Sequence, residues 1–238
     1  MHRAGAKKRI AQAVFGKGDG IWIRRASRCL MRGHPARPST QLFKYCFVAF
    51  INMKVRPEDS LKIENIVASA KVTDYLDLPA LASKIKDAEY NKKRFPGVVL
   101  RMQDPKIAAL VFGSGKVVLT GAKSIDSLSK GLNILGNLLR SLNIDIPKKL
   151  NYKIQNIVTS ADLATAINLN KIAVGFNLDR IEYEPEQFPG LVYRLENPKV
   201  VVLLFGSGKL IITGGKEPED AKKAVVKILA DLRSLGLM

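Results

Sequence analysis

The side chains that most often carry nucleophilic catalysis or bind zinc are confined to the first quarter of the chain. Both histidines, both cysteines and the single tryptophan lie there: His2, His34, Cys29, Cys46 and Trp22. Residues 57–238 therefore cannot form a Ser–His triad, a Cys nucleophile or a zinc site of the usual N/S type. Paired carboxylates remain formally open as an acid–base set, but no pair of acids has the apolar surroundings that would raise a pKa. We predict no enzymatic activity, no catalytic residue, no metal and no cofactor.

The remaining chemistry favours a polyanionic partner. Of the 238 residues, 39 are Lys or Arg and 21 are Asp or Glu, which gives a formal net charge of +18. Such an excess is typical of proteins that bind nucleic acid and, less often, an anionic membrane. No apolar run approaches the ~20 residues that a membrane-spanning helix needs, so an integral membrane protein is not expected.

Most of this charge lies in a basic N-terminal extension, residues 1–56. It holds 13 basic residues and one acid, Asp19, without a sustained helical or strand period. Three interpretations are open: a disordered tail that adds non-specific DNA affinity, a transit peptide, or a start codon assigned too early, ahead of Met53. We favour the first and third over targeting, because the apolar stretch at 42–51 carries Lys44 and lacks a small-residue cleavage signal.

The rest of the chain is one unit duplicated. IENIVASA at 63–70 matches IQNIVTSA at 154–161, and the segment at 95–123 matches the segment at 188–216 with 16 of 29 positions identical. Each copy spans about 90 residues, which is far longer than a solenoid repeat. We therefore predict two fused repeats, residues 57–147 and 148–238.

The two copies predict the same elements. An apolar strand near 61–70 precedes a short helix with Leu78, Leu81, Ala82 and Ile85 on one face. Three short strands follow, near 97–103, 106–112 and 116–121, and a longer helix closes the copy. In the first copy this helix is capped by Ser124 and has the apolar positions Ile125, Leu128, Leu132, Leu135 and Leu139. In the second copy Pro218 suits the first turn. The expected order is β-α-β-β-β-α, twice.

Two of these strands are apolar at every position. The segments at 107–112 (IAALVF) and 200–205 (VVVLLF) predict a sheet with apolar side chains on both faces. An antiparallel sheet with one solvated face usually alternates instead. Two helices per copy can cover only one face, so the other must meet a second copy, another domain or a ligand.

The paired motifs resemble a known family. Asn-Ile-Val, Phe-Pro-Gly, Pro-Lys, Phe-Gly-Ser-Gly-Lys and Thr-Gly-(Ala/Gly)-Lys occur in the order and spacing of the TATA-box-binding proteins of archaea and eukaryotes, from about Leu61 to the C-terminus. The resemblance implies an α+β fold with one curved, ten-stranded antiparallel saddle and helices on its convex face. It also implies a general transcription factor that binds the minor groove of A/T-rich TATA elements, kinks the DNA and recruits transcription factor B and RNA polymerase. An archaeal source would place it in the cytoplasm with the nucleoid, and a eukaryotic source in the nucleus.

The resemblance also implies residue roles, position by position. The DNA-intercalating wedges correspond to Phe95, Phe112, Phe188 and Phe205. The minor-groove contacts correspond to Asn65, Asn156, Val67, Val158, Thr120, Thr213, Leu110, Leu203, Val118 and Ile211. The phosphate contacts correspond to Arg101, Arg194, Lys116 and Lys209.

The two repeats differ where a protein partner is expected. The first reads Asn-Lys-Lys-Arg at 91–94 and the second Glu-Pro-Glu-Gln at 184–187. The resemblance makes Glu184 and Glu186 the binding site for transcription factor B, although Gln187 stands where some family members carry Leu. Two rival functions are an accessory domain of a nucleic-acid enzyme and a binder of RNA or single strands that stacks bases on the aromatic rings.

Overall fold

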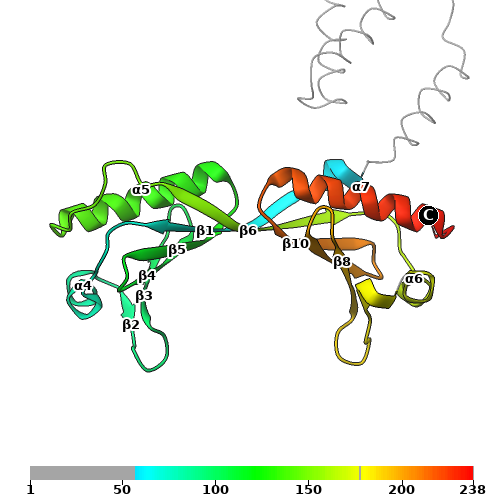
Figure 1. Ribbon diagram of the computed structural model, residues 1–238, viewed down its shortest axis with the longest axis horizontal. Coiled ribbons are helices and arrows are strands. Elements are labelled where there is room, and N and C mark those ends of the chain that lie inside the picture. Colours follow the sequence, from blue (N-terminus) through cyan, green and yellow to red (C-terminus); the bar gives the residue numbers. More distant parts are fainter. Residues whose placement is uncertain (1–56, 177, 238) are drawn as a thin grey trace, which may run out of the picture. The chain divides into compact units, whose positions relative to one another are not determined.

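The computed structural model describes residues 57–176 and 178–237. The basic extension, residues 1–56, lies outside this part of the chain, so the expectations about it stay predictions. Within it, no helix is long and apolar enough to cross a membrane. The described body is one antiparallel sheet with helices along one face (Figure 1).

The order of strands in the sheet mirrors the duplication. It runs β2-β3-β4-β5-β1-β6-β10-β9-β8-β7, with every neighbouring pair antiparallel. The two repeats therefore join through the central pair β1 and β6. The strands are β1 (Lys62–Lys71), β2 (Glu89–Tyr90), β3 (Gly97–Met102), β4 (Ile107–Phe112), β5 (Lys116–Ala122), β6 (Tyr152–Asp162), β7 (Ile181–Glu182), β8 (Gly190–Leu195), β9 (Val200–Phe205) and β10 (Lys209–Gly215).

Each repeat has one strand more than the expected element order. The extra strands, β2 and β7, have two residues each and pair with the outer sides of β3 and β8. Two residues are too few to show a period in the sequence. The order is thus β-α-β-β-β-β-α in each repeat. The resulting ten strands confirm the α+β saddle that the resemblance implies.

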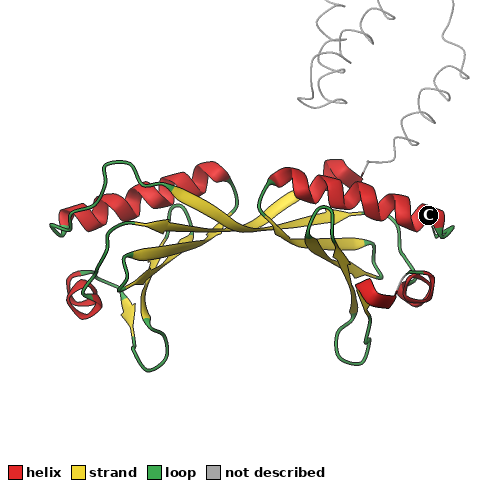
Figure 2. Ribbon diagram, viewed as in Figure 1, coloured by secondary structure: helices red, strands yellow, loops and turns green. Residues whose placement is uncertain are grey.

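The helices lie on the convex side of the sheet and beside its ends (Figure 2). Ser124 caps the first long helix as predicted, accepting a hydrogen bond from the backbone N–H of Ser127 at 3.0 Å. Ile85 packs against the first core as predicted, although it is the C-cap residue of α4. The prediction for Ile125 is wrong, because this first residue of α5 is exposed. The helical elements are η1 (Pro57–Ser60), α4 (Leu78–Lys84), α5 (Ile125–Ser141), α6 (Leu169–Gly175), η2 (Leu178–Arg180) and α7 (Pro218–Ser234).

Within the described part of the chain, helices cover one face of the sheet and leave the other uncovered. Leu128, Leu132, Leu135 and Leu139 of α5 are buried in the first repeat's core, and the corresponding face of α7 is buried in the second. In β4 and β9, fully buried residues alternate with half-buried ones. Because the half-buried positions are also apolar, the prediction of a sheet that is apolar on both faces is confirmed.

Tight turns after β4 and β9 depend on glycine. Gly115 and Gly208 have φ of +70° and +86°, a region that L side chains rarely adopt. A Cβ at either glycine would also collide with the backbone of Thr73 or Thr165. These turns end the strands at Phe112 and Phe205, which fixes both rings at the rim of the uncovered face.

Candidate nucleic-acid interface

Apolar side chains line the uncovered face in cross-strand rows. Val118 lies opposite both Leu110 and Ser69, and the second repeat repeats this row with Ile211, Leu203 and Ser160. The predicted groove contacts all lie on this face and are half-buried: Asn65, Asn156, Val67, Val158, Thr120, Thr213, Leu110, Leu203, Val118 and Ile211. The structure brings them together on one surface, and their contact with DNA stays a prediction.

Two asparagines near the centre of this face are held in a defined orientation. The backbone N–H of Gly121 donates to Asn65 Oδ1 at 2.7 Å, and the N–H of Gly214 donates to Asn156 Oδ1 at 2.7 Å. A backbone N–H can only donate, so the atom facing it must be the amide oxygen. Each amide nitrogen then donates to a threonine hydroxyl, at 3.2 Å in the first repeat and 3.1 Å in the second. An amide NH₂ carries two protons, which leaves one donor on each asparagine for a ligand.

The predicted wedges form one phenylalanine pair in each repeat. The ring centroids are 5.6 Å apart for Phe95 and Phe112, and 5.9 Å apart for Phe188 and Phe205. Glycine makes room for the second pair, because a Cβ at Gly190 would lie 2.7 Å from the Phe188 ring and 3.1 Å from the Phe205 ring. Phe188 is 38% exposed although it is a large apolar residue. Each pair is therefore a preformed aromatic edge with part of its surface in water.

The four predicted phosphate contacts are two arginines that form ion pairs with glutamates and two exposed lysines. Arg101 Nε lies 3.1 Å from Glu89 Oε1, and Arg194 Nη2 lies 2.9 Å from Glu182 Oε1. The hydrogen bond and charge of Glu89 raise the pKa of Arg101 above its usual value. Lys116 and Lys209 are exposed. A phosphate at either arginine would have to share it with a carboxylate, whereas no carboxylate of the described residues lies at ion-pair distance from either lysine.

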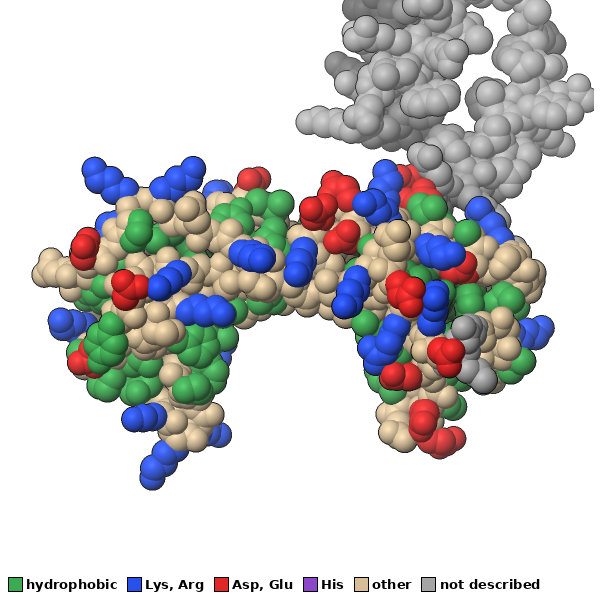
Figure 3. Space-filling model, viewed as in Figure 1, with side chains coloured by type: hydrophobic (Ala, Val, Ile, Leu, Met, Phe, Trp, Pro, Cys, Tyr) green, Lys and Arg blue, Asp and Glu red, His purple; other side chains and the backbone are tan. Residues whose placement is uncertain are grey.

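The two loops that project from the sheet carry opposite charge (Figure 3). We call residues 91–96 the first stirrup and residues 184–189 the second stirrup. The first carries Lys92, Lys93 and Arg94, and the second carries Glu184 and Glu186, all exposed. Gln187 Nε2 donates to Glu184 Oε2 at 2.7 Å, so the residue that departs from the family pattern contacts one of the predicted partner-binding acids.

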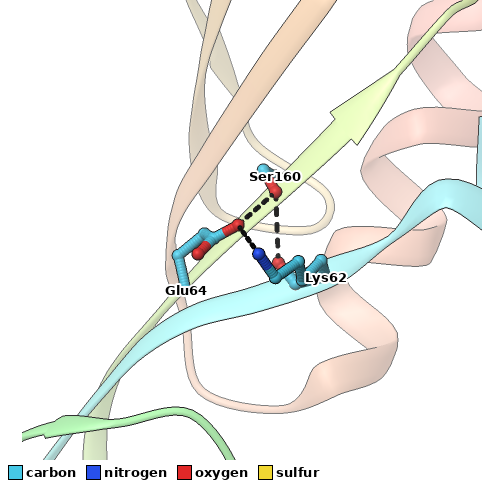
Figure 4. A network of polar contacts seen from close by, with 3 residues as sticks. All are labelled: Lys62, Glu64 and Ser160. Carbon is cyan, nitrogen blue, oxygen red and sulfur yellow. Dashed lines mark hydrogen bonds and ion pairs between the residues drawn. The ribbon is translucent and has the colours of Figure 1, made fainter.

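A polar group at the middle of the uncovered face was not predicted (Figure 4). The Ser160 hydroxyl donates to Glu64 Oε1 at 2.9 Å, and Lys62 Nζ lies 3.2 Å from the same oxygen. In the mirror position Gln155 Nε2 donates to Ser69 Oγ at 2.7 Å. The sequence does contain a sign of this group, because the matching segments IENIVASA and IQNIVTSA differ at their second residue, Glu64 in one and Gln155 in the other. Among the described residues, no cluster of His, Cys, Asp or Glu could hold a metal ion.

The sequence matches one family model twice. The model described as transcription factor TFIID (or TATA-binding protein, TBP) matches residues 60–142 and again residues 151–235. The chain belongs to the TATA-box-binding protein family. Family membership places it among transcription factors and not among enzymes, as predicted from residues 57–238.

The similar proteins of this family are matched over nearly their whole length. The TATA-box-binding protein of Archaeoglobus fulgidus is 56% identical over 178 residues, which are 75% of this chain and 97% of that protein. TATA-box-binding protein E of Halobacterium salinarum is 56% identical over 182 residues, 76% of this chain and 98% of that protein. Among solved structures, Methanococcus jannaschii TBP has a TM-score of 0.68 and 48% identity, covering 74% of this chain and 99% of that chain.

Proposed function

We propose that this protein is a general transcription factor that binds the minor groove of A/T-rich TATA elements and kinks the DNA there. The observation that carries the proposal is the uncovered apolar face, bounded by a phenylalanine pair in each repeat and carrying asparagine donors near its centre. Large exposed apolar surfaces usually mark binding sites. The +18 charge supports a polyanion as the ligand.

The chemistry of the face suits A·T pairs. In the minor groove A·T pairs present only the acceptors A N3 and T O2, whereas G·C pairs add the guanine amine. The free amide protons of Asn65 and Asn156 can donate to these acceptors. Leu110, Val118 and their counterparts offer no partner to an amine, so a buried guanine amine would lose its hydrogen bonds to water.

The phenylalanine pairs act on the shape of the DNA. An apolar wedge that enters a base step unstacks it and bends the duplex toward the major groove, a strategy for which TATA-binding proteins are themselves a standard example. The exposed part of the Phe188 ring is then buried against bases. Arg101, Arg194, Lys116 and Lys209 hold the phosphates on either side, which fixes position without reading sequence.

The second stirrup receives a protein partner. Glu184 and Glu186 are exposed beside the second wedge pair and opposite in sign to the first stirrup. We assign them to transcription factor B, through which RNA polymerase is recruited. Charge complementarity of this kind selects one partner face more than it adds affinity.

Competition between duplexes at one stated salt concentration tests this function. We expect the full chain to prefer an A/T-rich duplex over a G/C-rich one. Replacing guanine by inosine removes the minor-groove amine and leaves the major-groove acceptors of the base in place, so I·C pairs should recover much of the A·T affinity. Equal binding to A·T and G·C duplexes, or tighter binding to the single strands, would refute the proposal.

A further inference from the structure

The middle of the uncovered face breaks the symmetry between the repeats. Glu64 and Gln155 occupy equivalent positions, each at an irregularity in the pairing of β1 with β6. Glu64 bonds to Ser160 and Gln155 bonds to Ser69. A carboxylate and an amide thus stand in mirror positions on an otherwise nearly symmetric surface.

Each of these side chains reaches across the joint into the other repeat's half of the face. Ser160 lies opposite Ile211, which lies opposite Leu203, so the Glu64 carboxylate belongs to the row of groove positions in the second repeat. By the same register Ser69 lies opposite Val118, which lies opposite Leu110, so the Gln155 amide belongs to the row in the first repeat.

The two groups have different hydrogen-bonding capacity. An ionised carboxylate only accepts hydrogen bonds, whereas an amide both donates and accepts. The hydrogen bonds from Ser160 and Lys62 lower the pKa of Glu64, which keeps the carboxylate ionised near neutral pH. Lys62 neutralises Glu64, while its counterpart Lys153 has no carboxylate at ion-pair distance among the described residues. The first repeat's half of the surface is thus the more positive one at its centre.

We propose that Glu64 and Gln155 read the direction of the DNA element. This inference rests on the proposed minor-groove function. The half of the element under the second repeat tolerates a guanine, because its exocyclic amine can donate to the Glu64 carboxylate. The half under the first repeat favours A·T pairs, because the Gln155 amide can donate to the acceptors A N3 and T O2 and its neutral oxygen accepts from an amine more weakly than a carboxylate does.

A palindromic A/T duplex with one G·C pair in one half isolates this effect, because the guanine alone then distinguishes the two DNA halves. The probe is an iron chelate attached to the thiol of Lys92→Cys, in a full chain that also carries Cys29→Ser and Cys46→Ser. The chelate cuts the DNA beside the first stirrup, so the position of the cut reports the direction in which the protein is bound. We expect the second repeat to sit over the guanine in about tenfold excess, the discrimination typical of one hydrogen bond to a charged group.

Two variants supply the matched controls. Glu64→Gln makes the two repeats alike at this position and should abolish the directional preference. Combining Glu64→Gln with Gln155→Glu should reverse it. An unchanged preference in Glu64→Gln would overturn the inference. Failure of every variant to prefer the unmodified palindrome over a G/C duplex would instead refute the proposed function.

Discussion

The phenylalanine pair of the second repeat should contribute strongly to the affinity for DNA and should produce one of its two kinks. A Phe side chain presents about 200 Å² when fully exposed. Phe188 is 38% exposed, so inserting it buries roughly 75 Å², worth ~2 kcal/mol at 25 cal/mol per Å². The half-buried Phe205 adds about 1 kcal/mol by the same conversion. Replacing both by Ala should therefore weaken binding by about 3 kcal/mol, more than a hundredfold.

Two measurements separate loss of the wedge from loss of the fold. Fluorescence resonance energy transfer between dyes at the ends of a TATA duplex reports the bend, and thermal unfolding of the free protein reports stability. The matched variant is Phe95→Ala with Phe112→Ala, which removes the other pair. We expect each double variant to reduce the bend by removing one kink. A Phe188/Phe205 variant that folds, binds and bends DNA as the parent does would refute the wedge role.

Two further predictions concern sites away from the groove. Changing Glu184 and Glu186 to Lys should leave binary DNA binding almost unchanged and abolish the ternary complex with transcription factor B. Gel-shift titrations measure both, with the charge-preserving Asp variants as control. An intact ternary complex would place the partner site elsewhere. Tyr193→Phe should lose about 1 to 2 kcal/mol of stability at pH 7, because the Tyr193 hydroxyl donates to Asp231 Oδ2 at 3.1 Å. Burial and Asp231 raise the pKa of Tyr193 to about 12, so the parent should lose this stability as pH rises from about 10 through 12, whereas the Phe variant should not. Urea unfolding across that pH range measures the difference, and Tyr75→Phe, at an exposed tyrosine, is the control.

The sequence predicted the fold best where a local pattern, such as an apolar run or a helix cap, determines the structure. The unbroken apolar runs at 107–112 and 200–205 predicted two apolar faces, and the alternation in β4 and β9 confirms them. Ser124 was identifiable as a cap because it directly precedes an apolar helical period. The strands β2 and β7 were missed because their pairing with β3 and β8 depends on tertiary context, not on their own two residues.

The interface was less accessible to prediction than the fold. The hydrogen bonds that fix Asn65 come from Gly121 and Thr120, more than fifty residues away, so no local pattern announces them. The Arg101–Glu89 ion pair likewise depends on the pairing of β2 with β3. The motifs that match between the repeats show what the two halves share, whereas Glu64 and Gln155 differ at equivalent positions near the joint and bond to Ser160 and Ser69.

That mismatch changes how direction on a promoter is expected to arise. The sequence predicted two matching repeats that differ at 91–94 and 184–187, where a protein partner is expected. Residues 57–147 and 148–238 each hold 13 basic and 10 acidic residues, so net charge cannot orient the protein. In the roles proposed above, the difference near the joint would act on the bases and the difference between the stirrups would act on the partner. These two effects on orientation are independent of each other. On a promoter where the guanine and the partner favour opposite orientations, we expect the protein alone to bind in the orientation set by the guanine. The ternary complex should bind in the orientation set by the partner.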